Sequence, residues 1–254
     1  MRTHALFAAA ALATVLPARA DDAPLKFITT LQLESKVAAA PPSSWSFTIV
    51  DARTRVEFEE SHIAGAINVP AVQVLGMLPR RVTDKHRELV FYCNGPKCTK
   101  SQKAARAATD LGYTNILEYN EGLPAWTKAG LAVAGSPLPP FEVPAISPER
   151  LASLLQRGAE PFMLDLRDSP EYLGFHLKGA VNIPLDQIML HMREIPTDQE
   201  IVLVDHSGPQ SVIAARLLHY LMGVDRMKRL DGGLTAWQLQ KLPVETTSAV
   251  AKTL

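Results

Sequence analysis

Short apolar runs alternate with helix-like segments along most of the chain. The apolar runs lack the alternation of a strand that faces water on one side, so they predict a parallel sheet buried on both faces. The runs predicted as strands are 47–50, 89–92, 115–118, 162–165, 201–204 and 227–230.

Apolar residues recur with the 3.6-residue period of an α-helix at 99–111 and 211–222. Gly112 and Gly223 follow these segments directly, which is typical of the glycine that ends a helix. Ser147, followed by proline, predicts the start of another helix, because serine is a favoured N-cap and proline suits the first helical position. The alternation of strands and helices predicts an α/β fold.

The second half of the chain repeats the first half. The segment 50–70, which contains VDARTRVEF and HIAGAINVP, recurs at 164–184 with LDLRDSPEY and HLKGAVNIP. The sequence GLPAW at 122–126 recurs as GLTAW at 233–237. A period of roughly 112 residues is too long for a solenoid repeat, so it predicts two copies of one domain.

The repeat also predicts the domain boundaries. We expect a first domain at 24–134, a linker at 135–146 and a second domain at 147–246. The linker is rich in proline. Because each proline fixes its backbone φ angle and lacks an N–H donor, the linker is expected to be stiff and extended.

Residues 1–20 are predicted to be a secretory signal peptide. Arg2 supplies a positive start, residues 5–16 form an apolar run, and Ala18 to Ala20 form a cleavage site with small residues. The apolar run is shorter than the roughly 20 residues that a membrane-spanning helix needs. The sequence therefore predicts a periplasmic or secreted protein that is not associated with a membrane after cleavage.

Composition argues against several classes of protein. The chain has 254 residues, of which 47% are hydrophobic and 20% charged, as in ordinary globular proteins. Its 26 basic residues balance its 26 acidic residues, so the charge does not favour a nucleic-acid partner. Two cysteines are too few for a disulfide-rich scaffold or a four-cysteine zinc site, and we expect neither a metal nor a cofactor.

The repeated motifs resemble the signature of the rhodanese family. They comprise residues 51–53, 57–58 and 62–70, a strand that ends in Cys93, and the glycine–tryptophan segment 122–126. The resemblance implies two rhodanese-like domains, each a small and mostly parallel sheet with helices on both faces. It also implies sulfurtransferase activity, in which a loop cysteine takes a sulfane sulfur from a donor such as thiosulfate. The resulting persulfide would pass the sulfur to a thiol or to cyanide.

Cys93 is the candidate catalytic nucleophile. It follows a predicted strand, and open parallel sheets place ligand sites at the carboxyl ends of their strands. Loop amides and the N-terminus of the next helix would direct partial positive charge at its sulfur, and Lys97 and Lys100 would add full charges. Such surroundings favour the nucleophilic thiolate. The loop predicted to bind an anionic donor consists of Asn94, Gly95, Pro96, Lys97, Cys98, Thr99 and Lys100.

The loop departs from the usual pattern of the family. Ser101, which opens the helix, lies eight positions after Cys93, whereas Ser211 lies only six positions after the corresponding Asp205. The loop also contains Cys98. Three roles stay open for Cys98: resolving a persulfide or sulfenic acid on Cys93 by forming a disulfide, holding a standing disulfide, or no role in the chemistry.

The second copy is expected to keep the fold without the nucleophile. Asp205 occupies the position of Cys93, and a carboxylate cannot form a persulfide and repels an anionic donor. Gln210 stands where the family usually has an arginine. We therefore interpret the second domain as non-catalytic, with Asp205 and His206 as parts of a vestigial loop. The domain could still form one wall of the cleft or bind a partner.

The remaining repeated residues have structural interpretations. Asp51 and Arg53 are expected to fix the turn after their strand by hydrogen bonds. His62 is expected to pack and to form a hydrogen bond, and a role as general base for Cys93 stays open. Trp126 is expected to anchor the core. The same interpretations apply to their counterparts in the second copy.

The leading hypothesis is an exported two-domain sulfurtransferase that forms a persulfide on Cys93. One alternative is an exported sulfur-carrier or binding module that exchanges a persulfide with a protein partner. Another is a thiol–disulfide redox protein that uses Cys93 and Cys98. The enlarged loop also resembles those of related phosphatases and arsenate reductases, and that chemistry is kept as a further alternative.

Overall fold

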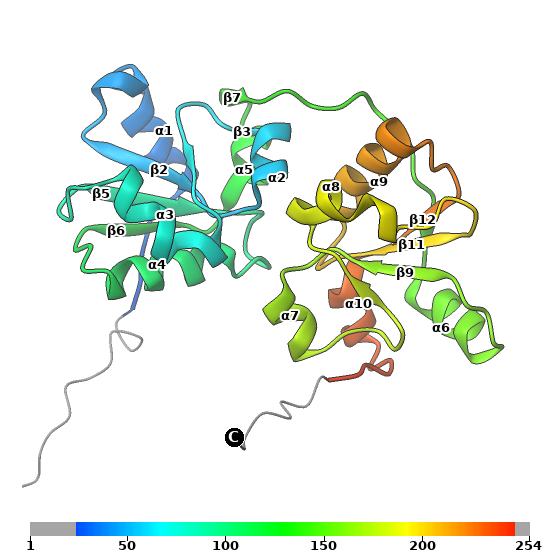
Figure 1. Ribbon diagram of the computed structural model, residues 1–254. Helices are drawn as coiled ribbons and strands as arrows, with labels where there is room; N and C mark the ends of the chain where they lie inside the picture. Colours follow the sequence, from blue (N-terminus) through cyan, green and yellow to red (C-terminus); the bar gives the residue numbers. More distant parts are fainter. Residues whose placement is uncertain (1–23, 247–254) are drawn as a thin grey trace, which may run out of the picture.

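The computed structural model describes residues 24–246, which form two lobes joined by an extended segment (Figure 1). The predicted signal peptide at 1–20 lies outside these residues. Each lobe contains a parallel sheet covered by helices, which confirms the predicted α/β fold and the two copies of one domain. Within the described range, no helix is long and apolar enough to cross a membrane.

The first domain is built on a parallel sheet with the strand order β1-β6-β5-β2-β4. Its strands are β1 (Lys26–Phe27), β2 (Phe47–Asp51), β4 (Ile67–Asn68), β5 (Glu88–Tyr92) and β6 (Ile116–Tyr119). A separate antiparallel pair consists of β3 (His62–Ile63) and β7 (Val133–Ala134). The helices are α1 (Thr30–Ala38), α2 (Arg55–Glu60), α3 (Val74–Arg81), α4 (Lys100–Asp110) and α5 (Gly122–Lys128), with 3-10 turns η2 (Pro42–Ser44) and η3 (Ala71–Gln73).

Both faces of this sheet are buried, as the uninterrupted apolar runs predict. Leu89 and Phe91 of β5 pack with residues of α3 and α4 in one hydrophobic cluster. Val90 and Tyr92 alternate with them and pack with residues of α1 and α5 in a second cluster. Successive side chains of a strand point to opposite faces, so one strand supplies both cores.

The second domain repeats this plan with the strand order β8-β12-β11-β9-β10. Its strands are β8 (Ala145–Ile146), β9 (Phe162–Asp165), β10 (Val181–Asn182), β11 (Ile201–Val204) and β12 (Met227–Leu230). Its helices are α6 (Pro148–Gln156), α7 (Ser169–Gly174), α8 (Ile188–His191), α9 (Pro209–Met222) and α10 (Gly233–Leu239), with 3-10 turns η4 (Leu185–Gln187) and η5 (Met192–Glu194). Both sheets thus have the same order of equivalent strands.

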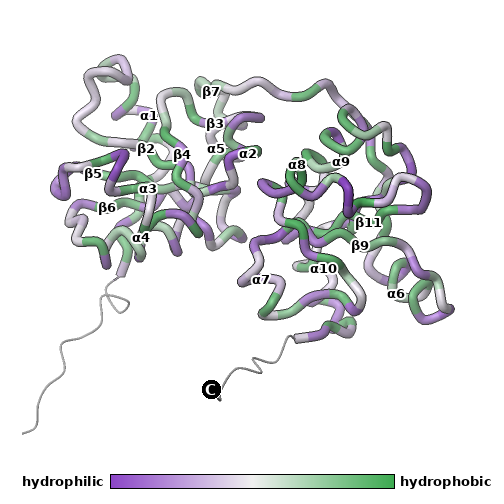
Figure 2. Tube along the Cα trace, viewed as in Figure 1, coloured by the Kyte–Doolittle hydropathy of each residue, from purple (hydrophilic) through white to green (hydrophobic). Residues whose placement is uncertain are grey.

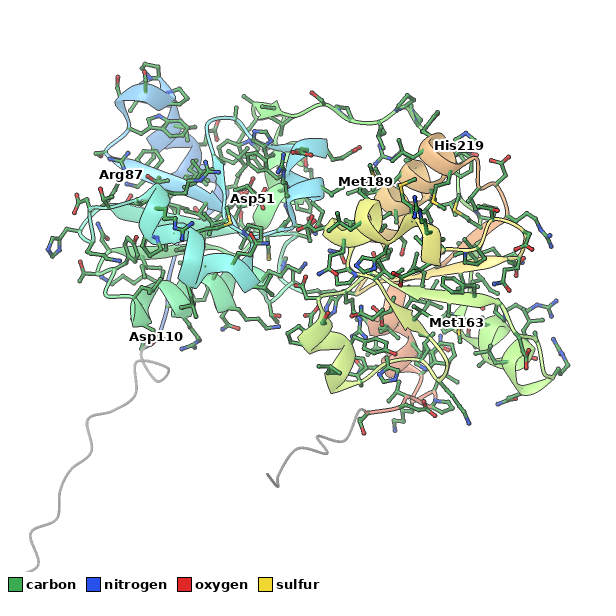
Figure 3. All side chains as sticks on the ribbon, viewed as in Figure 1. Asp51, Arg87, Asp110, Met163, Met189 and His219 are labelled. Atoms are coloured by element: carbon green, nitrogen blue, oxygen red, sulfur yellow. The ribbon has the colours of Figure 1, made fainter. Side chains whose placement is uncertain are left out.

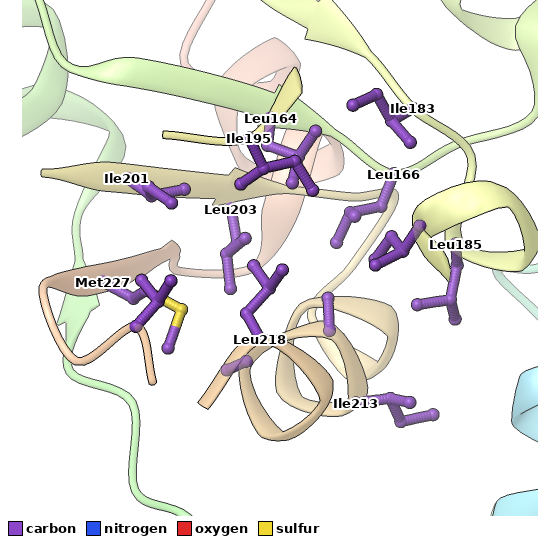
Figure 4. Packing of buried hydrophobic residues seen from close by; sticks show 14 residues of the cluster. Leu164, Leu166, Ile183, Leu185, Ile195, Ile201, Leu203, Ile213, Leu218 and Met227 are labelled. Atoms are coloured by element: carbon purple, nitrogen blue, oxygen red, sulfur yellow. The ribbon is translucent and has the colours of Figure 1, made fainter. Parts of the chain in front are cut away.

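The central strand of the second domain also contributes to two clusters. Ile201 and Leu203 pack with Ile213 and Leu218 of α9, as Figure 4 shows. The alternate residues of β11 pack with α6 and α10 in another cluster. The neighbouring strands β9 and β11 are mostly hydrophobic in Figure 2, which agrees with burial on both faces.

The ends of the helices follow the predicted signals. Gly112 and Gly223 have positive φ angles of 85° and 67°, as expected of glycines that end helices. The Ser147 side chain accepts the N–H of Arg150 and caps α6. Helix α9 begins at Pro209, two residues before the predicted start, because proline is favoured at the first position of a helix.

A buried ion pair fixes the turn after the second strand of each domain. The Arg53 guanidinium donates to Asp51 at 2.6 Å and to the Ser61 carbonyl at 2.6 Å. Both side chains are almost fully buried, and Asp51 lies inside the first lobe (Figure 3). Arg167 and Asp165 repeat the pair at 2.7 Å in the second domain. The predicted structural role of these residues is therefore confirmed.

Helix α2 of the first domain packs against the second domain. Asp186 of the second domain accepts the N–H groups of Arg55 and Val56 at 3.2 and 3.0 Å, at the beginning of α2. Val56 also packs against a hydrophobic cluster of the second domain. Glu60, at the other end of α2, forms an ion pair with Arg216 of α9. The second domain therefore holds both ends of α2.

Two reciprocal contacts join the loops of the two domains. Lys100, the first residue of α4, forms an ion pair with Asp168 of the second domain at 3.3 Å. Gln210, which occupies the position of Lys100 in the second copy, donates to Glu57 of the first domain at 3.1 Å. Each loop therefore contacts a residue that comes shortly after the second strand of the other domain.

We expect Asp168→Asn to destabilise the protein more than the control Glu171→Gln. Asp168 pairs with Lys100, whose side chain is 11% exposed, whereas Glu171 pairs with Lys103, whose side chain is 56% exposed. Removing one partner of a buried pair should cost about 2 kcal/mol, against about 0.5 kcal/mol for the solvated pair. Urea unfolding measures both changes, and equal losses would contradict this account of the interface.

Candidate active site

Cys93 lies directly after β5, at the carboxyl end of the central strand of the first sheet. Cys93 is only 1% exposed to solvent. Its carbonyl accepts the N–H of Leu123 at 3.0 Å, so the start of the loop is anchored to α5. The candidate nucleophile is thus held rigidly at the edge of the sheet where parallel strands place their ligand sites.

The surroundings of Cys93 favour its thiolate. A hydrogen-bonding interaction with the Cys98 thiol lowers the pKa of the Cys93 thiol to about 7, against the opposing effect of burial. The hydroxyl and backbone N–H of Ser101 and the backbone N–H of Gly95 also lower this pKa. Because Ser101 belongs to the first turn of α4, the helix N-terminus acts on the sulfur as the sequence predicts.

A buried hydrogen-bond chain runs from Cys93 to Glu118, which the sequence did not identify. The Ser101 hydroxyl lies 3.2 Å from Cys93 Sγ and donates to Glu118 Oε1 at 2.8 Å. Burial raises the pKa of Glu118. Glu118 is a lone acidic residue in β6, and that break in an apolar strand was the available sequence signal.

Asn94 connects the loop to a buried carboxylate. Its amide donates to Glu57 Oε1 at 2.6 Å. Burial alone would raise the pKa of Glu57, but the charges of Lys100 and Arg53 and the hydrogen bonds from Asn94 and Thr54 outweigh it and lower the pKa. Glu57 therefore stays ionised inside the protein and holds the loop in place.

The two lysines of the loop differ in their environment. Lys97 is exposed, whereas Lys100 is buried between Glu57 and Asp168. Burial alone would lower the pKa of Lys100, but these carboxylates raise it. The sequence predicted that both lysines add full charges beside the sulfur. The structure gives Lys100 its own carboxylate partners, one of them from the second domain.

A small cavity of about 30 Å³ separates the Cys93 loop from the second domain. It has room for about one or two water molecules. Its walls consist of Asn94, Cys98, Thr99, Lys100, Glu171, Asp205, His206, Ser207, Pro209 and Gln210. His206 also donates from Nε2 to the Lys97 carbonyl at 3.0 Å. The second domain thus forms one wall of the site, a role that the sequence left open.

Both cysteines are free thiols in this structure. Cys98 is half-buried and lines the cavity, whereas the cavity-lining residues of the described chain do not include Cys93. The Cys93 thiol lies 3.2 Å from the Cys98 carbonyl. The interaction with Cys93 is the largest of several effects that raise the pKa of the Cys98 thiol. The two sulfurs therefore lie close together in distinct surroundings.

The other predicted loop residues position the backbone. Gly95 is buried and has a φ angle of +96°, which favours glycine. Its carbonyl accepts the N–H of Cys98 at 2.9 Å, which closes a turn within the loop. Pro96 and Thr99 are exposed. Their predicted contact with a substrate stays a prediction.

The corresponding loop of the second domain holds its own carboxylate. Asp205 accepts the backbone N–H groups of Gly208 at 2.6 Å and Ser211 at 3.0 Å. Burial raises the pKa of Asp205. Among the described residues, the Ser211 hydroxyl has no hydrogen-bond partner, although its counterpart Ser101 has two. The donors that face the sulfur in the first domain face an aspartate here.

The histidines and tryptophans of the repeat have the predicted structural contacts. His62 stacks on Phe58 with 3.6 Å between ring centroids, and its Nδ1 lies 2.7 Å from the Phe58 carbonyl. His176 makes the same contacts with Tyr172. Trp126 is buried and donates to a loop carbonyl, as does its counterpart in the second domain. Within residues 24–246, no cluster of His, Cys, Asp and Glu is arranged to hold a metal ion.

The sequence model of the rhodanese-like domain family matches the chain twice, at residues 33–129 and 147–240. The chain belongs to the rhodanese family. This result confirms the tandem rhodanese-like domains that the sequence motifs indicate. Each match includes the central strand and the loop that follows it.

Several known proteins are similar to parts of this chain. A sulfurtransferase of Allochromatium vinosum is 32% identical over 101 residues, which cover 39% of this chain and 92% of the relative. The thiosulfate sulfurtransferase PspE of Escherichia coli is 30% identical over 67 residues, or 26% of this chain and 62% of PspE. The HTH-type transcriptional regulator Rv0324 of Mycobacterium tuberculosis is 36% identical over 92 residues, or 36% of this chain and 39% of the regulator. The matches thus span less than two thirds of the last two relatives.

We expect Gly122→Ala to destabilise the first domain more than Gly112→Ala. Both glycines have positive φ angles, so both variants should lose about 1 kcal/mol from backbone strain. A Cβ atom at Gly122 would also lie 2.4 Å from the Cys93 carbonyl oxygen, whereas a Cβ atom at Gly112 meets nothing within 4 Å. This overlap should cost about 1–3 kcal/mol more. Urea unfolding compares the variants, and equal losses would show that the loop does not need the close approach.

We expect one thiolate of the native protein to appear with a midpoint near pH 7, and Cys98→Ala, which removes the side-chain donor, to raise that midpoint. The pKa of Cys93 is lowered mainly by its interaction with Cys98, and the pKa of Cys98 is raised. Absorbance at 240 nm between pH 5 and 9 measures the titration. Cys93→Ser, as control, should lack the step, and a midpoint that is unchanged in Cys98→Ala would contradict the interaction.

Proposed function

We propose that the protein is an exported sulfurtransferase that carries sulfane sulfur as a persulfide on Cys93. The observation that carries the proposal is the buried Cys93 thiol at the end of the central strand, whose pKa is lowered in part by the backbone N–H groups of Gly95 and Ser101. A thiolate is the nucleophilic form of cysteine, so this site is ready for attack at neutral pH. Membership of the rhodanese family and relatives named sulfurtransferases support the same chemistry.

In the first step, the Cys93 thiolate attacks the outer sulfur of a donor such as thiosulfate. A bond forms between Cys93 Sγ and that sulfur, and the bond between the two donor sulfurs breaks. Sulfite leaves with the electron pair. The donors from Gly95 and Ser101 would stabilise the negative charge on the sulfur during transfer. In the second step, a thiol or cyanide takes the outer sulfur and restores the thiolate.

The second domain has a supporting role in this proposal. Asp205 replaces the nucleophile and occupies the donors of its own loop. The domain instead supplies Asp168, Gln210 and His206 to the first loop. Because the cavity has room for about one or two water molecules, a donor as large as thiosulfate enters only after some of these contacts open.

The proposal includes export to the periplasm or the medium, on the pattern of a signal peptide in residues 1–20. The donors and acceptors are proposed as small anionic sulfur compounds and thiols or cyanide. A protein that donates or accepts a persulfide is an alternative partner. The close approach of the two cysteines favours one second candidate function, a thiol–disulfide redox protein.

We expect the reduced protein to gain 32 Da, one sulfur atom, after incubation with thiosulfate. Intact-mass spectrometry measures the adduct, which should require Cys93 and should disappear when cyanide is added. Cys93→Ser is the control that loses the nucleophile but keeps the loop. The same spectrum reports whether the chain from an exporting host begins at Asp21.

An unmodified mass after thiosulfate, together with a loss of 2 Da on mild oxidation that needs both cysteines, would contradict the proposal. That outcome would favour the redox protein. An adduct that forms only from a protein persulfide, and not from thiosulfate, would favour the sulfur carrier.

A further inference from the structure

The Cys93 loop contains a second sulfur with donors of its own. The backbone N–H groups of Asn94 and Lys100 act on the Cys98 sulfur and favour its thiolate, whereas those of Gly95 and Ser101 act on Cys93. The ammonium group of Lys100 also interacts with Cys98. The loop therefore offers two adjacent positions at which backbone amides can stabilise an anionic sulfur.

The two positions differ in their access to the cavity. Cys93 is 1% exposed, and the described residues around the cavity include Cys98 but not Cys93. The cavity lies against the second domain, where His206 and Gln210 form its opposite wall. An acceptor that arrives between the domains would meet Cys98 before it reached Cys93. A sulfur on Cys93 would be buried, whereas a sulfur on Cys98 would face the acceptor.

We propose that Cys98 is a second sulfur carrier, which receives the sulfane sulfur from the Cys93 persulfide and presents it in the cavity to a thiol acceptor. The proposal rests on the proposed function, because the sulfur enters through Cys93. It assigns Cys98 a catalytic role in the outward transfer.

The transfer balances without an added oxidant or reductant. The Cys93 persulfide first takes the Cys98 proton through the interaction between the two groups. The Cys98 thiolate then attacks the outer sulfur of the Cys93 persulfide. A bond from Cys98 Sγ to that sulfur forms, the bond from Cys93 Sγ breaks, and its electron pair stays on Cys93 as a thiolate. An acceptor thiolate later attacks the same outer sulfur and leaves Cys98 as a thiolate.

The acidities of the two thiols support this direction. In thiol exchange, the more acidic thiol is the better leaving group, and the more basic thiolate is the stronger nucleophile. The pKa of Cys93 is lowered and that of Cys98 is raised. Cys93 is therefore suited to release the sulfur and Cys98 is suited to take it.

Peptide mapping can locate the sulfur, because trypsin cleaves after Lys97 and separates the two cysteines. Full-length protein is loaded with thiosulfate, alkylated in the native state and digested. In the wild type we expect the 32 Da sulfur on both cysteines. In Cys98→Ser, the sulfur should accumulate on Cys93 alone.

Kinetics with two acceptors test the role of Cys98. In Cys98→Ser, we expect transfer from loaded protein to glutathione to fall at least tenfold. Transfer to cyanide, which is smaller than the thiosulfate that loads Cys93, should change less than twofold. Each rate is measured in a single turnover of loaded protein, so the loading step, which depends on the pKa of the Cys93 thiol, does not enter the comparison. Ser35→Ala, at an exposed position of α1 that does not line the cavity, is the control and should change neither rate.

Sulfur on Cys93 alone in the wild type, or an unchanged rate with glutathione in Cys98→Ser, would overturn the second carrier. A disulfide between the two peptides with release of sulfide would overturn it as well. Failure of the proposed function has a different signature, since the wild type would then take up no sulfur or Cys93→Ser would still take it up.

Discussion

A buried acidic group at the carboxyl end of the central strand is the constraint on which both domains depend. An ionisable group in the interior can carry its charge only when hydrogen-bond donors replace the lost water. In the first domain this group is Cys93, which faces Gly95 and Ser101; in the second it is Asp205, which faces Gly208 and Ser211. Both domains place backbone donors at this position. Only the first domain has a cysteine there, so only that domain can form a persulfide.

The donors must be held in place, and much of the surrounding packing serves that purpose. Gly122 allows α5 to approach the Cys93 carbonyl more closely than any side chain would permit. Glu57 fixes Asn94 from the other side and compensates the buried charge of Lys100. Asp168 supplies a second compensating carboxylate from the other domain. The second domain therefore stabilises the loop electrostatically, although its own loop lacks a thiol.

The sequence was sufficient for the features that depend on local patterns. Apolar runs identified the longer strands, Gly112 and Gly223 identified helix ends, and the repeat identified two domains of the same topology. The two-residue strands β1, β3, β4, β7, β8 and β10 are too short to give such a run and were not predicted. The position of Cys93 at the carboxyl edge of the sheet was predictable, because Cys93 directly follows a predicted strand. The ion pair of Lys100 with Asp168 could not be predicted, because Asp168 belongs to the other domain. A local sequence pattern does not indicate how two domains pack together. Glu118 was missed for a similar reason, since register between strands brings it to Ser101.

The length of the loop separates the two domains most clearly. The span from Cys93 to Ser101 has two more residues than the span from Asp205 to Ser211. In the shorter loop, the amides of Gly208 and Ser211 converge on one carboxylate. In the longer loop, the turn at Gly95 carries Cys98 to the cavity, and amides are divided between two sulfurs. The shorter loop of the second domain holds a single anion, so that task does not need the two additional residues. The proposed role of the second sulfur explains them.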